Sequence, residues 1–243
     1  MNIAVLLAGG SGTRMKASIP KQHLEIRGHQ LVEYTLQAYS MCKGIDKLLV
    51  VSHRDWISTY KDLQDRFPKL EWIIEGGSKR SLSVYNAVVF LAQVCGPEDF
   101  IIMADAVRPC ITNRELSELL ASLKVNDAAT SGMELYETVL KMSEDTISDI
   151  FYRDSMFRQT SPEAYRFESL RELYLDRPMA EVEQYQNIGI DQLHGMRKRI
   201  GIVRSTPLNF KITTSEDLLL FDMVVKKGFE NYLKYENLGI DLP

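Results

Sequence analysis

Short apolar runs alternate with amphipathic segments through the first half of the chain. The apolar runs are short enough to be buried strands and lie at Ile3–Leu7, Lys47–Val51, Glu71–Ile74 and Phe100–Met103. Between them, apolar side chains recur at the spacings of a helix with one buried face, over Leu31–Met41, Trp56–Phe67 and Leu82–Val94. Parallel strands need crossover connections of this kind. The first ~130 residues are therefore predicted to form an α/β unit, a parallel sheet with helices on both faces.

The pattern changes after a further strand candidate at Asp127–Gly132. The segments Tyr136–Met142 and Ser148–Phe157 are short and strand-like, and no helical pattern separates them, which is typical of a β-ribbon. We therefore predict an arm over about residues 134–160 that projects from the sheet.

The last third of the chain returns to ordinary elements. Arg166–Leu175 has helical spacing, and Ile200–Arg204 is strand-like. Ser215–Tyr235 is predicted to be the C-terminal helix, with Ser215 as its N-cap and Asp217 in its first turn. Because no linker, low-complexity tract or internal repeat interrupts the sequence, residues 1–243 are predicted to form one domain.

Composition narrows the class of protein. The formal net charge of −4 leaves no basic footprint for nucleic acid or an anionic membrane surface. The three cysteines lack the spacing of a zinc site and are odd in number, so we expect reduced thiols in the cytoplasm. The N-terminal apolar run is too short for a signal peptide, and no apolar stretch is long enough to span a membrane. An anionic small molecule is the expected ligand.

The loop LAGGSGTRMKASIPKQ follows the first predicted strand, at the end of the sheet where ligands bind. Gly9, Gly10 and Gly12 allow backbone amides to approach a ligand closely. Arg14 and Lys21 add a planar fork and a mobile point charge for phosphate oxygens. The loop is neither a P-loop nor a dinucleotide GxGxxG motif. A tight strand-to-helix turn is the alternative to a polyphosphate cradle.

Two further loops follow predicted strands. In EGGSKRSLSV, Gly77 and Ser83 are candidates to back and hydrogen-bond a nucleotide base, although with Arg80 they also suit a simple cap of the next helix. Asp105 directly follows the apolar run FIIM. It is a candidate Mg²⁺ ligand, since this hard cation is bound through one or two carboxylates plus phosphates. The alternative is a buried ion pair between Asp105 and Arg108.

Lys211 and His53 complete the candidates. Lys211 stands between apolar Phe210 and Ile212 just before a predicted helix, which favours a place in a cleft over the open surface. His53, in HRDW, is more typical of a structural histidine than of a catalytic base.

In order along the chain, the segments LAGGSGTRM, PKQ, GGSKRSLSV, DAVRP, ETV, an altered QTPQ and NFKITTSEDL resemble the cytidylyltransferases that make CDP-alditols. This family includes the 2-C-methyl-D-erythritol 4-phosphate and ribitol-5-phosphate cytidylyltransferases, and the similarity spans nearly the whole chain. It implies a Rossmann-like nucleotidyltransferase domain. It also implies that a phosphate oxygen of the acceptor attacks the α-phosphorus of CTP and that pyrophosphate leaves.

The resemblance also implies roles for individual residues. Arg14, Lys21 and Lys211 would stabilise the developing charge, and Asp105 would hold Mg²⁺. Matches to the nucleotide-binding positions are Ala8, Gly9, Gly10, Gly12, Gly77 and Ser83.

The acceptor would be bound by Asp105 and Arg108, and by Thr138 and Arg153 of the ribbon. In such enzymes the ribbon clasps a second subunit and reaches into its alditol-phosphate pocket. A homodimer that uses CTP and an alditol phosphate is therefore expected.

Three positions depart from the family pattern: Ala104 replaces a histidine, Pro207 an acidic residue, and QTSPE stands for QTPQ. A Thr-Asp pair of the family survives at most as Asp191. The HRDW segment looks like the HGDW of ribitol-5-phosphate enzymes, which favours D-ribitol 5-phosphate over 2-C-methyl-D-erythritol 4-phosphate. Transfer of another nucleotide, and a non-catalytic nucleotide-binding protein, are the alternatives.

Overall fold

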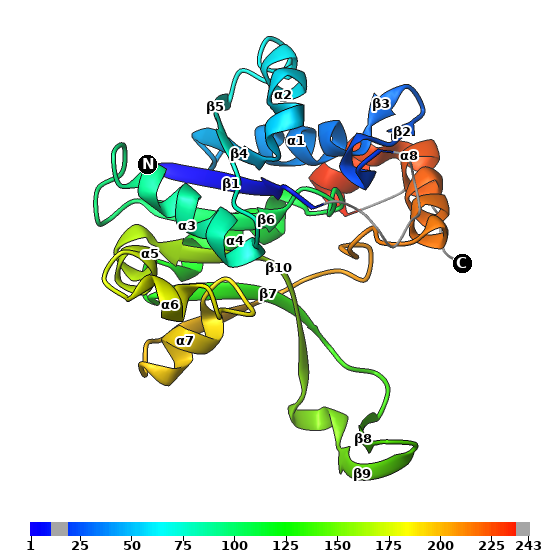
Figure 1. The fold of residues 1–243 in the computed structure, drawn as a ribbon. Coiled ribbons are helices and arrows are strands. Elements are labelled where there is room, and N and C mark those ends of the chain that lie inside the picture. Colours follow the sequence, from blue (N-terminus) through cyan, green and yellow to red (C-terminus); the bar gives the residue numbers. More distant parts are fainter. Residues whose placement is uncertain (11–18, 237–243) are drawn as a thin grey trace.

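The computed structural model describes residues 1–10 and 19–236. Within these residues, seven strands form one sheet in the order β11-β7-β10-β6-β1-β4-β5 (Figure 1). Strand β10 runs antiparallel to β6 and β7, and the other neighbouring pairs are parallel. The strands are β1 (Asn2–Ala8), β4 (Lys47–Ser52), β5 (Leu70–Glu75), β6 (Phe100–Asp105), β7 (Ala128–Glu134), β10 (Phe157–Arg166) and β11 (Ile200–Arg204). The mostly parallel α/β sheet predicted from the apolar runs is confirmed.

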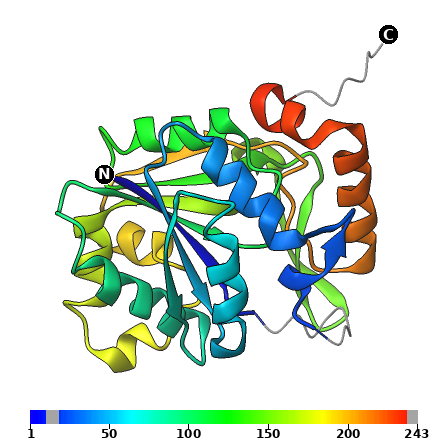
Figure 2. The same ribbon diagram turned by 90° about the horizontal axis from the view of Figure 1, so that it is seen from above.

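Helices cover both faces of the sheet (Figure 2). Because strand side chains alternate between faces, Leu6 of β1 packs into one core and Val5 into the other. The first core is closed by α1 (Leu31–Met41), α2 (Ile57–Leu63), α4 (Asn113–Ser122) and α8 (Ser215–Tyr235). The second is closed by α3 (Arg80–Leu91), α5 (Phe167–Tyr174), α6 (Met179–Val182) and α7 (Ile190–Gly195).

The predicted ribbon consists of β8 (Val139–Ser143) and β9 (Thr146–Phe151), a two-stranded antiparallel sheet. Figure 1 shows it projecting well away from the main sheet on the extensions of β7 and β10. Since β7 runs parallel to β6, the ribbon leaves the sheet at the edge where β6 ends in Asp105. That edge is the one at which ligands of parallel sheets bind.

Strand β10 and helix α4 are among the elements that were not predicted. Strand β10 begins at Phe157, so the predicted second ribbon segment, which ended at that residue, was too long. The polar residues and Pro162 of β10 give this segment no strand-like sequence pattern. Its pairing with β7 is interrupted by a bulge between Gln159 and Glu163. Helix α4 was overlooked although Leu116, Leu119 and Leu120 have helical spacing and are buried.

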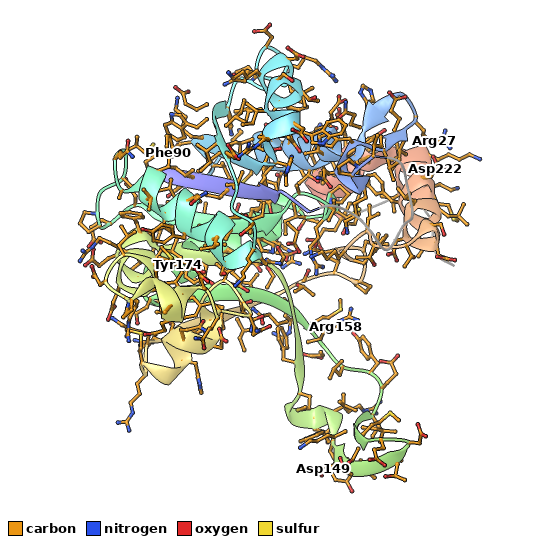
Figure 3. All side chains as sticks on the ribbon, viewed as in Figure 1. Arg27, Phe90, Asp149, Arg158, Tyr174 and Asp222 are labelled. Atoms are coloured by element: carbon orange, nitrogen blue, oxygen red, sulfur yellow. The ribbon has the colours of Figure 1, made fainter. Side chains whose placement is uncertain are left out.

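The C-terminal helix begins at Ser215, and its N-cap lies one residue before the predicted one. Thr214, not Ser215, is the N-cap: its hydroxyl accepts a hydrogen bond from the Asp217 amide, and the Asp217 carboxylate accepts one from the Thr214 amide. Gly228 has a φ of 123° and kinks the helix. Before the kink, Asp222 pairs with Arg27 between β2 (Glu25–Ile26) and β3 (His29–Gln30), as Figure 3 shows. No described helix has the length and apolar character needed to cross a membrane.

Candidate active site

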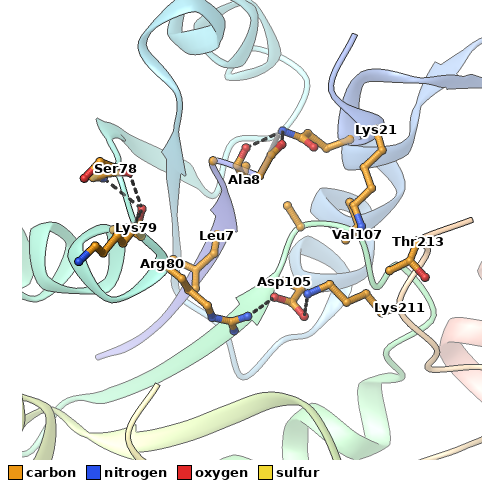
Figure 4. A pocket seen from close by; sticks show the side chains of 16 residues that line it. Leu7, Ala8, Lys21, Ser78, Lys79, Arg80, Asp105, Val107, Lys211 and Thr213 are labelled. Carbon is orange, nitrogen blue, oxygen red and sulfur yellow. Dashed lines mark hydrogen bonds and ion pairs between the residues drawn. The ribbon is translucent and has the colours of Figure 1, made fainter. Parts of the chain in front are cut away.

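A cavity of about 420 Å³ opens at the carboxyl ends of β1 and β6, beside the start of α3 (Figure 4). It draws its walls from segments far apart in the sequence: the glycine-rich loop, the 3-10 turn Lys21–His23, the loop before α3, and the segment before α8. The polar side chains that line it include Lys21, Lys79, Arg80, Ser83, Asp105 and Lys211. Their charges make the described wall of the cavity predominantly positive, which suits a polyphosphate.

The 3-10 turn is hydrogen-bonded to the described start of the glycine-rich loop. The side-chain amide of Gln22 donates hydrogen bonds to the carbonyls of Ala8 (2.7 Å) and Gly10 (3.0 Å). His23 stacks on Trp56, with ring centroids 3.9 Å apart, and so ties the turn to the segment after β4. Burial lowers the pKa of the His23 imidazole. The turn that begins with Lys21 is therefore anchored to two other segments, through Gln22 and His23.

The loop before α3 forms the opposite wall. The Gly77 amide donates to Ser83 Oγ (3.1 Å), and that hydroxyl donates to the Lys79 carbonyl (3.1 Å). A side chain at Gly77 would collide with Leu82, whose Cβ would lie 2.4 Å from the added carbon. A Cβ built on Gly9 would lie 3.9 Å from Ser83 Oγ, so the two predicted nucleotide-binding loops face each other.

Lys21 connects two walls of the cavity. Its ammonium donates to the Ile212 carbonyl (2.7 Å), 191 residues away in the chain, and its side chain is buried. Ile212 directly follows Lys211, whose ammonium lies 3.1 Å from Asp105 Oδ2. The two lysines predicted from separate motifs thus converge on one cavity, as Figure 4 shows.

Asp105 is surrounded by cations. Its Oδ1 lies 3.2 Å from Arg80 Nη1, and its Oδ2 lies 3.3 Å from Arg108 Nε and 3.1 Å from Lys211 Nζ. Burial alone would raise the pKa of this carboxyl, but the charges of Arg80, Lys211 and Arg108 outweigh it and hold the pKa at about 2. The ion pair with Arg108 weighed in the sequence is present, as one of three.

A network of polar residues behind the cavity positions Asp105. Ser161 Oγ, inside the β10 bulge, accepts a hydrogen bond from the Asp105 amide (3.2 Å). Asn209 donates to the Ser161 carbonyl (2.9 Å), and its own carbonyl accepts from Arg108 (3.0 Å). Burial raises the pKa of nearby Glu163 to about 7, although the Tyr165 hydroxyl donates to its carboxylate. The altered QTPQ segment therefore braces Asp105 through backbone and side-chain contacts.

The structure places most of the predicted residues together. Ala8, Gly9, Gly10, Lys21, Gly77, Ser83, Asp105 and Lys211 line the cavity, and Arg108 contacts Asp105 from behind. Gly12 and Arg14 lie outside the described residues. Thr138 and Arg153 do not line the cavity: both are exposed on the ribbon, where Arg153 donates to the Tyr136 carbonyl (2.5 Å).

Arg80 and Gln22 were not among the predicted site residues. Arg80 stood in the GGSKRSLSV motif but was weighed only as part of a helix cap, and Gln22 stood in PKQ. The departures at Ala104 and Pro207 do not line the cavity. Ala104 is buried in the first core and Pro207 is exposed, while His53 and Asp191 are exposed and do not line the cavity.

The acidic side chains allow only a simple metal site. In the described part of the chain, no group of three or more His, Cys, Asp or Glu side chains is arranged to hold a metal ion. Asp105 offers hard oxygen ligands at the cavity wall, which fits a Mg²⁺ ion that takes its remaining ligands from phosphates and water.

A model of the 2-C-methyl-D-erythritol 4-phosphate cytidylyltransferase family matches residues 2–227. The chain belongs to this family. The enzyme of this name from Thermotoga neapolitana is 30% identical, covering 93% of this chain and 98% of the relative. The ribitol-5-phosphate cytidylyltransferase of Lacticaseibacillus paracasei is 29% identical, covering 93% and 99%.

Solved structures agree at the level of the fold. The crystal structure of 2-C-methyl-D-erythritol 4-phosphate cytidylyltransferase from Francisella tularensis superposes with a TM-score of 0.75, at 23% identity over 91% of this chain and 98% of that chain. As a family member, the chain is a cytidylyltransferase and thus a nucleotidyltransferase, as its motifs predicted.

Proposed function

We propose that this cytidylyltransferase transfers CMP from CTP to an alditol phosphate, with D-ribitol 5-phosphate as the favoured acceptor and Mg²⁺ as the cofactor. The convergence of Lys21, Lys211 and Asp105 on one cavity between two glycine-bearing loops carries the proposal. A cavity rich in fixed cations stabilises the negative charge that develops on phosphate oxygens during transfer.

In the proposed reaction, an oxygen of the acceptor phosphate forms a bond to the α-phosphorus of CTP, and the bond from that phosphorus to the pyrophosphate oxygen breaks. Lys21, fixed by the Ile212 carbonyl, stabilises charge without reorganising during the step. Arg14 is proposed to assist from the glycine-rich loop. Lys211 and Arg108 hold Asp105 on one oxygen and contribute positive charge on the acceptor side.

The nucleotide is proposed to lie against the two facing loops. Ala8, Gly9 and Gly10 would contribute backbone on one side, and Gly77 and Ser83 would contribute the other side. Gly12 is proposed to join the first side on the ground of its sequence motif alone. Mg²⁺ held by Asp105 would neutralise charge on the triphosphate. These roles, and the cytoplasmic location expected from the cysteines, stay predictions.

The acceptor choice rests on the HRDW segment, and both acceptor types occur among relatives of near-equal identity. We expect purified protein with CTP and Mg²⁺ to release pyrophosphate faster with D-ribitol 5-phosphate than with 2-C-methyl-D-erythritol 4-phosphate. The reverse order would assign the isoprenoid-type acceptor instead.

The same assay tests two alternative functions, the transfer of another nucleotide and nucleotide binding without catalysis. Parallel reactions with ATP, GTP and UTP report the nucleotide preference. Thermal stabilisation by CTP without pyrophosphate release from either acceptor would favour a non-catalytic nucleotide-binding protein and contradict transfer to an alditol phosphate.

A homodimer formed through the ribbon is the second part of the proposal. Leu140 is paired with Ile150 and Met142 with Ile147 across the ribbon, and all four side chains are exposed in the single chain. A two-stranded ribbon is marginal by itself, and an exposed apolar face of this kind is typical of a protein interface. In a dimer, Thr138 and Arg153 would then reach the partner's acceptor site.

Ile147→Lys is expected to convert the dimer to a monomer, because it places a charge on the apolar face of the ribbon. Light scattering after size exclusion measures the mass, and Lys141→Gln is the matched control because Lys141 pairs with Asp149 rather than with the apolar residues. If the wild-type protein is itself a monomer at micromolar concentration, or if Ile147→Lys remains dimeric, the ribbon does not form the interface.

A further inference from the structure

We propose that Arg80 is a triphosphate-binding residue that rests on Asp105 in the free protein and leaves it when the nucleotide enters. This inference rests on the proposed function, since it assigns a new residue to the same site. Arg80 is the first residue of α3 and lines the cavity, and Figure 4 shows its guanidinium directed at Asp105.

The contacts of Asp105 divide unequally between its two oxygens. Arg108 and Lys211 both contact Oδ2, whereas Arg80 contacts Oδ1. If Arg80 left, Asp105 would keep two positive partners. The carboxylate would therefore not become an uncompensated buried charge, which is the costly outcome of breaking an ion pair.

Arg80 is also the most easily released of these partners. Its side chain is 43% exposed, against 30% for Lys211 and 16% for Arg108. Arg108 has a second anchor in the Asn209 carbonyl. Exposed ion pairs contribute little to stability, so the contact between Arg80 and Asp105 is the one that an incoming ligand can replace most readily.

A triphosphate offers Arg80 a better partner. The planar guanidinium binds two phosphate oxygens at once, and the charge on a phosphate group exceeds that on one carboxylate. Its movement would at the same time expose Asp105 Oδ1 to a divalent cation that arrives with the nucleotide. The movement of the Arg80 side chain would thus couple nucleotide binding to metal binding by the Asp105 carboxylate.

Neighbouring Lys79 provides a matched control. It lines the same cavity and carries the same charge, but its ammonium pairs with Glu183, 3.4 Å away, and Figure 4 shows it pointing away from Asp105. Arg80→Gln and Lys79→Gln therefore remove equal charge from adjacent positions. A difference between the variants reports the contact with Asp105 and the reach of Arg80, not the net charge of the cavity.

Two binding measurements without acceptor test the proposal. In EDTA, calorimetry should show that Arg80→Gln weakens CTP binding by ~10-fold or more relative to Lys79→Gln, because a charge-assisted phosphate contact is lost. Without nucleotide, electron paramagnetic resonance of free Mn²⁺ should show that Arg80→Gln binds this cation several-fold more tightly than Lys79→Gln, because Oδ1 has lost its competing cation.

Arg80→Lys, which keeps the charge without the planar fork, should bind Mn²⁺ like the wild type and CTP with intermediate affinity. Thermal melts verify that each variant is folded. If Arg80→Gln matches Lys79→Gln in either measurement, the proposal is wrong. Because no acceptor is present, that failure leaves CMP transfer intact, and an absence of transfer would leave both binding results valid.

Discussion

Lys21→Ala is expected to lower turnover by ~10²-fold or more, the usual effect of removing one preorganised charge from a developing oxyanion. The ammonium of Lys21 is fixed by the Ile212 carbonyl at 2.7 Å and faces the cavity that contains Asp105. Steady-state kinetics with saturating CTP and acceptor measure the change, and the loss should appear in kcat more than in KM, because the charge develops only in the transition state.

Lys21→Met separates charge from folding, since it keeps the buried alkyl chain and removes only the ammonium. Lys47→Ala is the control for a lost lysine: Lys47 begins β4, at the other end of the strand from the cavity, and is half-buried in a pair with Glu71. Near-normal turnover in folded Lys21→Met would remove Lys21 from the mechanism.

The parallel half of the fold is predictable because its strands are buried on both faces. β1, β4 and β6 appear in the sequence as continuous apolar runs, and their ends lie within one or two residues of the prediction. β10 is different. Within its bulge, Ser161 contacts the Asp105 amide and Asn209, and no local pattern in FRQTSPEAYR encodes those distant partners.

The site residues are predictable singly, but their partners are not. Short motifs identified Lys21, Lys211 and Asp105, whereas the bond from Lys21 to Ile212 spans 191 residues and depends on the whole sheet. For Arg80, the sequence allowed a helix cap as readily as a ligand-binding role. Only the tertiary placement of α3, which begins at Arg80, brings its guanidinium to Asp105.

Asp105→Asn is expected to reduce kcat/KM by ~10²-fold or more, since an amide cannot balance the surrounding cations or hold a metal ion as a carboxylate does. Arg108 and Lys211 would lose their shared negative partner at 3.3 and 3.1 Å and turn toward other anions. Asp62→Asn, which changes an exposed carboxylate on α2, is the control for the substitution itself.

Asp105→Asn should also show how much the charge of Asp105 contributes to the stability of the protein without ligands. The cations lower the folded-state pKa of Asp105 to about 2, below the unfolded value near ~4, so its contribution is present above pH ~4 and is lost as pH falls through about 2. The shift corresponds to about 2 kcal/mol. Urea unfolding from pH 7 to pH ~3 should show a gap between wild type and Asp105→Asn that narrows below pH ~4. A gap that stays constant with pH would mean that the arginines and Lys211 do not act on Asp105 through its charge.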